Sequence, residues 1–242
     1  MVEPNIELLH TYTACDISDA LLKLQGPGPA GHIPHIRPYA PSQPSSPERP
    51  SVPKTIAPAS TVLFGVKPAP PPSEQPPASL PPNTHFADLT PSGTIVVISQ
   101  PQETFQTNAV LGGIVATRMK VLGAKGVVVD GNVRDVRELS ALGREDEEGG
   151  GFHIWARGTS TAGAGAGSVP LAVQTPLTVG ETVVKPGDII VSDPLNGVVC
   201  IPRDLLSSVL ELLPGIVAAD DRVIEDVRRG VGVKEAFRRH RN

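Results

Sequence analysis

The segment from Gly93 to Val133 constrains the fold more than any other part of the chain. It contains two short apolar runs, GTIVVIS at 93–99 and GVVV at 126–129. Each run is rich in β-branched residues and bounded by turn residues, which is typical of a buried strand. A helix opened by glycine is predicted between them, over residues 113–122. Strand, helix and strand with short joins predict a βαβ unit, and therefore two parallel strands with a right-handed crossover.

The remaining apolar segments predict an α/β protein around this unit. Residues 5–24 are expected to be helical with a break near 11–13, because Thr13 and Asp16 have the spacing of a capping box. Asp16 and its neighbour Asp19 are therefore interpreted as helix-start charges. Further strands are expected at 59–66, 154–156 and 171–173 and in a β-rich meander over 179–202, and two helices at 203–213 and 218–229.

Proline is unevenly distributed, and this affects the domain organisation. The chain of 242 residues has 27 prolines, most of them between Pro27 and Pro82. A chain of this length can bury one sizeable core or two small ones. We therefore predict a single domain over residues 1–242, interrupted by proline-rich inserts at 40–55 and 68–82.

Charge and apolar content exclude several classes of protein. A net charge of −4 gives no electrostatic reason to expect nucleic-acid binding. Cys15 and Cys200 are far apart in sequence and indicate reduced core thiols rather than a disulfide framework or a zinc site. The N-terminal segment lacks the pattern of a signal peptide, and no apolar run approaches the ~20 residues of a membrane span. A cytoplasmic protein with no membrane partner is expected.

The predicted helix after the first strand opens on two glycines, Gly112 and Gly113. The first amides of a helix have no acceptor within the helix. The amides of Ile114 and Val115 are therefore expected to point outward and to form a seat for a carboxylate or phosphate.

Arg134 and Asp135 follow the second predicted strand, where ligands tend to bind in parallel sheets. Arginine grips a carboxylate with two parallel hydrogen bonds, and an aspartate suits a hydrated Mg²⁺ or Mn²⁺. We expect residues 130–132 to form a tight turn that orients both side chains. An Arg-Asp pair after a strand is more often a surface ion pair, but the preceding glycine-opened helix favours an anion-and-metal site.

The stretch from Gly112 to Asp135, GGIVATRMKVLGAKGVVVDGNVRD, resembles the signature of the RraA-like family. That family includes the 4-hydroxy-4-methyl-2-oxoglutarate aldolases and the regulator of ribonuclease activity A. The similarity extends over most of the chain, and the proline-rich inserts suggest a fungal-type member. Four further segments are similar to family motifs: CDISDAL at 15–21, APASTV at 57–62, WARG at 155–158 and KPGDIIVSDPLNGVVCIP at 185–202.

The resemblance implies a layered β/β/α core of the swivelling type, a homotrimer or hexamer, and a metal-dependent class II aldolase and decarboxylase. Such an enzyme gives pyruvate from 4-hydroxy-4-methyl-2-oxoglutarate-type substrates or from oxaloacetate. By the same resemblance, Arg134 binds the substrate carboxylate, Asp135 holds Mg²⁺ (or Mn²⁺), and the amides of Ile114 and Val115 complete the anion seat. Aldolase members often carry an aspartate where this chain has Gly113, so decarboxylation is implied more strongly than aldol cleavage.

The resemblance also implies an acidic residue supplied by the C-terminal helix of a neighbouring subunit. Three residues are weak candidates for it, and each is more often part of a solvated helix face: Asp220, Asp221 and Glu225.

Two other functions remain open at this point. Regulators in the same family bind a ribonuclease without doing chemistry, and such a binding protein could keep the Arg-Asp turn. A Schiff-base aldolase would use Lys120 or Lys125, although Lys125 lies in a turn rather than in a desolvated pocket. The segment TSTAGAGAGS at 159–168 lacks a following helix, which excludes a dinucleotide-binding motif. Its glycines make it a candidate flexible cover for a site.

Overall fold

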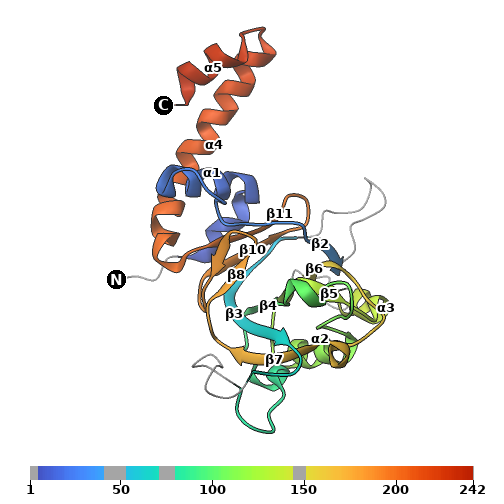
Figure 1. Ribbon diagram of the computed structural model, residues 1–242. Helices are drawn as coiled ribbons and strands as arrows, with labels where there is room; N and C mark the ends of the chain where they lie inside the picture. The colour runs from blue at the N-terminus through green and yellow to red at the C-terminus, as the bar shows by residue number, and fades with distance from the viewer. Residues whose placement is uncertain (1–4, 41–52, 71–79, 144–150, 242) are drawn as a thin grey trace.

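The computed structural model describes residues 5–40, 53–70, 80–143 and 151–241 (Figure 1). Most of the two predicted proline-rich inserts, and residues 144–150, lie outside the described residues. The described chain forms a mixed α/β structure built on one large sheet and a small hairpin. This confirms the α/β prediction.

The large sheet has nine strands and contains both parallel and antiparallel pairs. Its order is β1-β11-β10-β3-β4-β5-β6-β2, and β7 also pairs with β3. The separate hairpin consists of β8 (Leu177–Val179) and β9 (Thr182–Val184). The nine strands are β1 (His32–Ile33), β2 (Arg37–Ala40), β3 (Thr55–Val66), β4 (Ile95–Ser99), β5 (Gly126–Val133), β6 (His153–Thr159), β7 (Ser168–Val173), β10 (Ile189–Asp193) and β11 (Gly197–Ile201).

The predicted βαβ unit is confirmed. β4 and β5 pair in parallel, with Ile95 opposite Gly126 and Ser99 opposite Asp130. Helix α2 (Gly113–Val121) connects them. β3 and β6 extend the parallel part on either side, whereas the strands toward the sheet edges pair antiparallel. The carboxyl ends of β4, β5 and β6 therefore lie along one edge.

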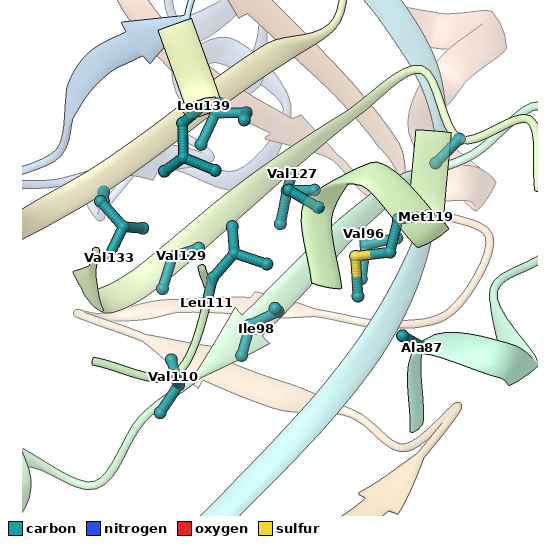
Figure 2. Packing of buried hydrophobic residues seen from close by; sticks show 14 of the residues in the cluster. Ala87, Val96, Ile98, Val110, Leu111, Met119, Val127, Val129, Val133 and Leu139 are labelled. Carbon is teal, nitrogen blue, oxygen red and sulfur yellow. The ribbon is translucent and has the colours of Figure 1, made fainter. Parts of the chain in front are cut away.

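Alternation along β4 and β5 divides the core into two layers. Val96, Ile98, Val127 and Val129 pack with residues of α2 and α3 (Val136–Leu142), as Figure 2 shows for Met119 and Leu139. Ile95, Val97 and Val128 belong to a second cluster with Ile190 and Val198 of β10 and β11. The two parts of the sheet are therefore packed against each other, and α2 and α3 cover the outer face of the parallel part. This is the layered β/β/α arrangement that the resemblance implied.

A second pair of helices covers the outer face of β10 and β11. Helix α1 (Ala14–Gln25) and helix α4 (Leu206–Arg228) share a cluster with apolar residues of both strands. α1 follows a short 3₁₀ helix, η1 (Ile6–Thr11), and begins with the predicted capping box. The Asp16 amide donates to Thr13 Oγ1 at 3.1 Å, and the Thr13 amide donates to Asp16 Oδ2 at 2.8 Å. Asp16 is thus a capping residue, as interpreted.

The prediction of two helices over 203–229 is wrong. α4 is one continuous helix that passes through Pro214. Its buried residues recur every three or four positions on both sides of the proline, so packing outweighs the local breaking effect. These residues are Leu206, Val209, Leu213, Ile216, Ala219 and Val223. A further helix, α5 (Val233–His240), follows, and the far end of α4 extends with it away from the sheet (Figure 1).

The expected tight turn at 130–132 is also wrong. Residues 130–133 continue β5 because they pair with β6, where Asn132 lies opposite Gly158 and Val133 opposite Thr159. The register shifts between Val129 and Asn132, which is typical of a bulge. The chain turns only after Val133.

Four 3₁₀ turns complete the described structure: η3 (Phe86–Leu89), η4 (Gln102–Thr104), η5 (Ala164–Ala166) and η6 (Arg203–Leu205). Within the described ranges, every helix is too short or too polar to cross a lipid bilayer.

Candidate active site

The turn after β5 presents Arg134 and Asp135 side by side at the carboxyl edge of the parallel strands. Asp135 has φ 58° and ψ 46°, which is the left-handed region, and it immediately precedes α3. Aspartate tolerates this region better than most residues, but the conformation still costs on the order of 1 kcal/mol. Strained positions of this kind cluster at binding sites. The backbone here therefore favours a functional turn over an ordinary surface loop.

The left-handed conformation directs the Asp135 carboxylate toward α2 rather than onto its own helix. Oδ2 accepts a hydrogen bond from the Gly113 amide at 3.0 Å and makes no capping bond to α3. Arg134 Nε lies 3.6 Å from the same oxygen. With their side chains 44% and 39% exposed, the two residues form an ion pair that contributes at most about 1 kcal/mol. Their proximity therefore matters more for ligand binding than for stability.

The predicted anion seat lies at the first turn of α2. The Gly113 amide donates its hydrogen bond to the Asp135 carboxylate, so it is unavailable to a ligand. The amides of Ile114 and Val115 have no acceptor among the described residues, as expected for the first turn of a helix. Ile114 is 85% exposed. An anion beside Arg134 therefore meets a guanidinium and the positive end of α2 together.

The glycine-rich segment after β6 reaches this site. A β-carbon placed on Gly163 would lie 2.9 Å from Arg134 Nη1 and 3.3 Å from Cζ. The Ala109 amide donates to the Ala162 carbonyl at 2.8 Å, and the Ser160 amide donates to the Val133 carbonyl at 3.0 Å. These bonds hold the segment against the site. The sequence offered Gly163 only as part of a candidate cover, and nothing local indicated its contact with Arg134.

Glu138, on the first turn of α3, occupies the space beside Gly113. A β-carbon on Gly113 would lie 2.9 Å from the Glu138 β-carbon, closer than β-carbons normally approach. An aspartate at position 113 would therefore require α3 to move.

A buried polar network lies behind the turn that carries Arg134 and Asp135. The Asn132 amide donates to Gln100 Oε1 at 2.8 Å, and Gln100 Nε2 donates to the Asn108 carbonyl at 2.9 Å. Asn108 Nδ2 donates to Ser168 Oγ at 3.0 Å. The network joins the ends of β4 and β5 to the start of β7, the strand that follows the glycine-rich segment. Sequence reasoning missed Gln100, although a polar residue directly after a buried strand was a usable signal.

Asp130 and Arg157 form a largely buried ion pair near the end of β5. Arg157 Nε donates to Asp130 Oδ1, and its guanidinium lies 5.5 Å from the ring centre of Phe105. Burial raises the pKa of Asp130, while the hydrogen bond and the charge of Arg157 act in the opposite direction. Both partners are engaged with each other, so this pair fits a structural role.

The residues present fit a hydrated Mg²⁺ or Mn²⁺ but not a closed protein cage. No group of three or more His, Cys, Asp or Glu side chains that could hold a metal occurs in the described part of the chain. Asp135 uses Oδ2 for Gly113, whereas Oδ1 has no hydrogen-bond partner among the described residues. Mg²⁺ usually keeps several waters and needs only one or two carboxylates plus substrate oxygens. One half-exposed carboxylate oxygen beside an anion seat meets that requirement.

The three candidate acids on α4 do not reach this turn within one chain. They lie on the part of α4 that extends away from the sheet (Figure 1). Asp220 is paired with Arg241, with both distances at 2.5 Å, and Glu225 is paired with Arg229 at 2.5 Å. Asp221 is exposed. A contribution from any of them requires a second copy of the chain.

The alternative lysines lie at the other end of α2. Lys125 is exposed, and Lys120 Nζ donates to the Leu142 carbonyl at 2.8 Å. Neither lysine shares the turn with Arg134, so the geometry does not favour a Schiff base at this site.

Comparison with known proteins identifies the class. Residues 14–200 match the family described as RraA-like, Aldolase/RraA. Because the match covers most of the chain, the protein belongs to the RraA-like family, which includes both aldolases and ribonuclease inhibitors.

Two relatives share 32% and 34% sequence identity with the chain. One is an uncharacterised protein of Methanocaldococcus jannaschii, 32% identical over 138 residues, which are 53% of this chain and 57% of the relative. The other, from Halalkalibacterium halodurans, is provisionally named a 4-hydroxy-4-methyl-2-oxoglutarate aldolase. It is 34% identical over 122 residues, which are 49% of this chain and 51% of the relative. The chain thus spans about half the length of these relatives.

Solved structures share the fold over nearly the whole chain. An uncharacterised protein from Pseudomonas syringae pv. tomato has a TM-score of 0.67 at 22% identity, covering 96% of this chain and 95% of its own. RraAS2 of Streptomyces coelicolor, described as an unusual member of the RNase ES inhibitor RraA family, has a TM-score of 0.65 at 21% identity. It covers 93% of this chain and 98% of its own. At these identities the likeness shows the fold alone.

Proposed function

We propose that the chain is a divalent-metal-dependent aldolase and decarboxylase that releases pyruvate from a short 2-oxo dicarboxylate. The observation that carries the proposal is the left-handed Asp135, whose carboxylate meets the start of α2 with Arg134 beside it. Family membership and the aldolase name of one relative support the reaction class. Oxaloacetate and 4-hydroxy-4-methyl-2-oxoglutarate-type acids are the proposed substrates.

Binding follows from the charges of the site. Arg134 takes the carboxylate next to the 2-oxo group through two parallel hydrogen bonds, and the amides of Ile114 and Val115 hold the same anion. Asp135 would hold Mg²⁺ (or Mn²⁺), which when bound supplies a Lewis acid for the 2-oxo group. The Gly113 amide keeps the Asp135 carboxylate oriented throughout, because it holds one of the two oxygens.

The chain's own part in bond cleavage is to stabilise developing charge. When the bond between C3 and C4 breaks, C4 leaves as CO₂ from oxaloacetate or as a second pyruvate from the aldol substrate. The electron pair of that bond moves through C3 toward the 2-oxo oxygen, so negative charge grows beside Arg134. A fixed guanidinium and fixed amides stabilise this charge without reorganising, which is how preorganised donors lower a barrier. The acid that completes proton transfer is proposed to come from α4 of a neighbouring copy, with Asp221 the candidate not engaged by an arginine.

The test is pyruvate release from oxaloacetate by the purified protein. We expect release with Mg²⁺, loss in excess EDTA, and recovery when Mg²⁺ is restored, after subtraction of the protein-free metal rate. Arg134→Lys keeps the positive charge but removes the two-pronged grip, so it should raise KM markedly. Release that persists in EDTA at the full rate would contradict a metal-dependent reaction.

A non-catalytic binding protein is the second candidate. Gly113 and the adjacent Glu138 favour it, because the site lacks the aspartate that aldolase members often carry there. Of the solved structures with this fold, the Streptomyces protein is described as an unusual member of an RNase ES inhibitor family, and one from Thermus as an RNA-processing inhibitor. No pyruvate release above the protein-free rate would support this candidate, with a ribonuclease as the first partner to test.

The proposed assembly is a homotrimer or hexamer. An acid from a neighbouring α4 can act at the Arg134 turn only if copies associate. Light scattering should therefore give three or six times the chain mass of 25.3 kDa. A mass of 25.3 kDa at assay concentration would contradict the proposed assembly.

A further inference from the structure

We propose that Gly112 and Gly163 form a slot for the Arg134 side chain, and that Gly163 is a positioning residue for carboxylate binding. Two chain segments far apart in sequence each place a glycine against the same arginine. The slot is a property of the fold, whereas its catalytic consequence rests on the proposed function.

Backbone geometry does not explain either glycine. Gly112 has φ −137° and ψ 178°, and Gly163 has φ −80° and ψ 172°. Any residue adopts these extended conformations. The requirement is therefore for space rather than for backbone freedom.

The Arg134 side chain lies close to the position that a β-carbon on either glycine would take. A β-carbon on Gly163 would lie 2.9 Å from Nη1 of Arg134. One on Gly112 would lie 2.7 Å from Asp135 Oδ2 and 3.2 Å from both Cγ and Nε of Arg134. Gly163 therefore lies against the tip of the Arg134 guanidinium, and Gly112 lies against the aliphatic part of the side chain and Nε. Together the two glycines limit the arginine along most of its length.

The walls of the slot are held more firmly than the arginine. On one side, the Gly112 carbonyl accepts from the Ala116 amide at 3.0 Å, within the first turn of α2. On the other side, the Gly163 carbonyl accepts from the Ala166 amide at 3.0 Å, and the Ala162 carbonyl accepts from the Ala109 amide. The Arg134 side chain is 44% exposed and has open space to move into. An added β-carbon should therefore displace the guanidinium and leave the walls in place.

Displacement matters because the grip on a carboxylate is directional. Two parallel hydrogen bonds form only when the plane of the guanidinium faces the carboxylate. The amides of Ile114 and Val115 form the other half of the anion seat. They are fixed within α2, so they cannot shift to match a displaced Arg134 guanidinium. A misplacement of about 1 Å can cost about 10²-fold in rate.

The glycine-rich segment supplies a matched control. Gly165 lies two residues from Gly163, and a β-carbon there would meet nothing within 4 Å. Gly163→Ala and Gly165→Ala therefore add the same methyl group to the same segment. Only the first one touches Arg134.

The experiment compares the two variants by oxaloacetate turnover and by labelling with phenylglyoxal, which modifies arginine side chains. Gly163→Ala should lower kcat/KM by about tenfold or more, mainly through KM, and should raise the modification rate of Arg134 measured by peptide mass spectrometry. Gly165→Ala should change neither value. Arg137, exposed on the next helix, serves as the internal reference for labelling.

The two readouts separate failure of the slot from failure of the proposed function. If wild-type protein releases no pyruvate, the labelling rates alone judge the slot. Equal Arg134 labelling in wild type and Gly163→Ala would overturn it. Altered labelling with unchanged kcat/KM in an active enzyme would overturn the positioning role. Unchanged Arg137 labelling shows that the reagent acts equally in each sample, and a far-UV circular dichroism spectrum equal to that of wild type shows that each variant has folded.

Discussion

At the scale of single residues, the site depends on which positions lack a side chain. Gly112 and Gly113 open α2, but each is also in close contact with another part of the site. Gly112 lies against Arg134 and the Asp135 carboxylate, and Gly113 lies against Glu138. The sequence predicted the glycines as a helix opening, which is correct. Their contacts were not predictable from the local sequence. Arg134 and Glu138 lie much further along the chain and meet the two glycines only in the folded protein.

Gly113→Ala should lower the free energy of unfolding, although alanine is the better helix former by about 1 kcal/mol. The new β-carbon would meet the Glu138 β-carbon at 2.9 Å, and overpacking of this kind costs about 1–3 kcal/mol. Gly215→Ala is the control, because Gly215 lies within α4 and has nothing within 4 Å. It should stabilise by about 1 kcal/mol. Urea unfolding measures both, and equal stabilisation by the two variants would show that α3 yields freely.

At the scale of elements, one carboxylate joins α1 to the turn between β10 and β11. Asp193 is 3% exposed. Its Oδ2 accepts from the Ala14 amide at 3.1 Å, and its Oδ1 accepts from the Leu195 amide at 3.0 Å. Burial raises the pKa of Asp193, but these bonds and those from Asn196 outweigh it, so the pKa lies below the ordinary value of 3.8. The ionised form therefore stabilises the fold.

Asp193→Asn should destabilise the protein at neutral pH by on the order of 2 kcal/mol, because hydrogen bonds to a charged group are lost. A lowered folded pKa gives stability that is present above pH 3.8 and is lost as the pH falls through the folded value. The difference between wild type and variant should therefore shrink below about pH 4. Chemical unfolding across pH measures it, with the exposed Asp221→Asn as control. A difference that stays constant with pH would contradict the ionised role.

Elements with a strong local pattern were predictable, and those decided by distant pairing were not. The β-branched run of β4 and the capping box at Thr13 specify their own structure, and both predictions are confirmed. The extension of β5 through Asn132 depends on pairing with β6. The continuity of α4 through Pro214 depends on packing against α1 and β10. Neither partner can be read from the local sequence.

At the scale of the whole molecule, the candidate site combines three separated segments on one edge of the sheet. The start of α2, the turn after β5 and the segment around Gly163 meet at Arg134. The sequence predicted the first two, because a βαβ unit brings its helix start and its strand end together. The third could not be predicted, because no local signal relates a glycine-rich segment to a particular arginine. The helical arm of α4 and α5 lies away from this edge within one chain (Figure 1).

The most direct test of the account compares oxaloacetate turnover by wild type and Asp135→Asn at saturating Mg²⁺. Asparagine keeps the shape and tolerates the left-handed conformation, but it removes the charge that would hold the metal. We predict a loss of about 10²-fold or more in kcat/KM, which corresponds to about 2.7 kcal/mol of transition-state stabilisation. A variant as active as wild type would contradict the assignment of Asp135, and with it the proposed metal-dependent site.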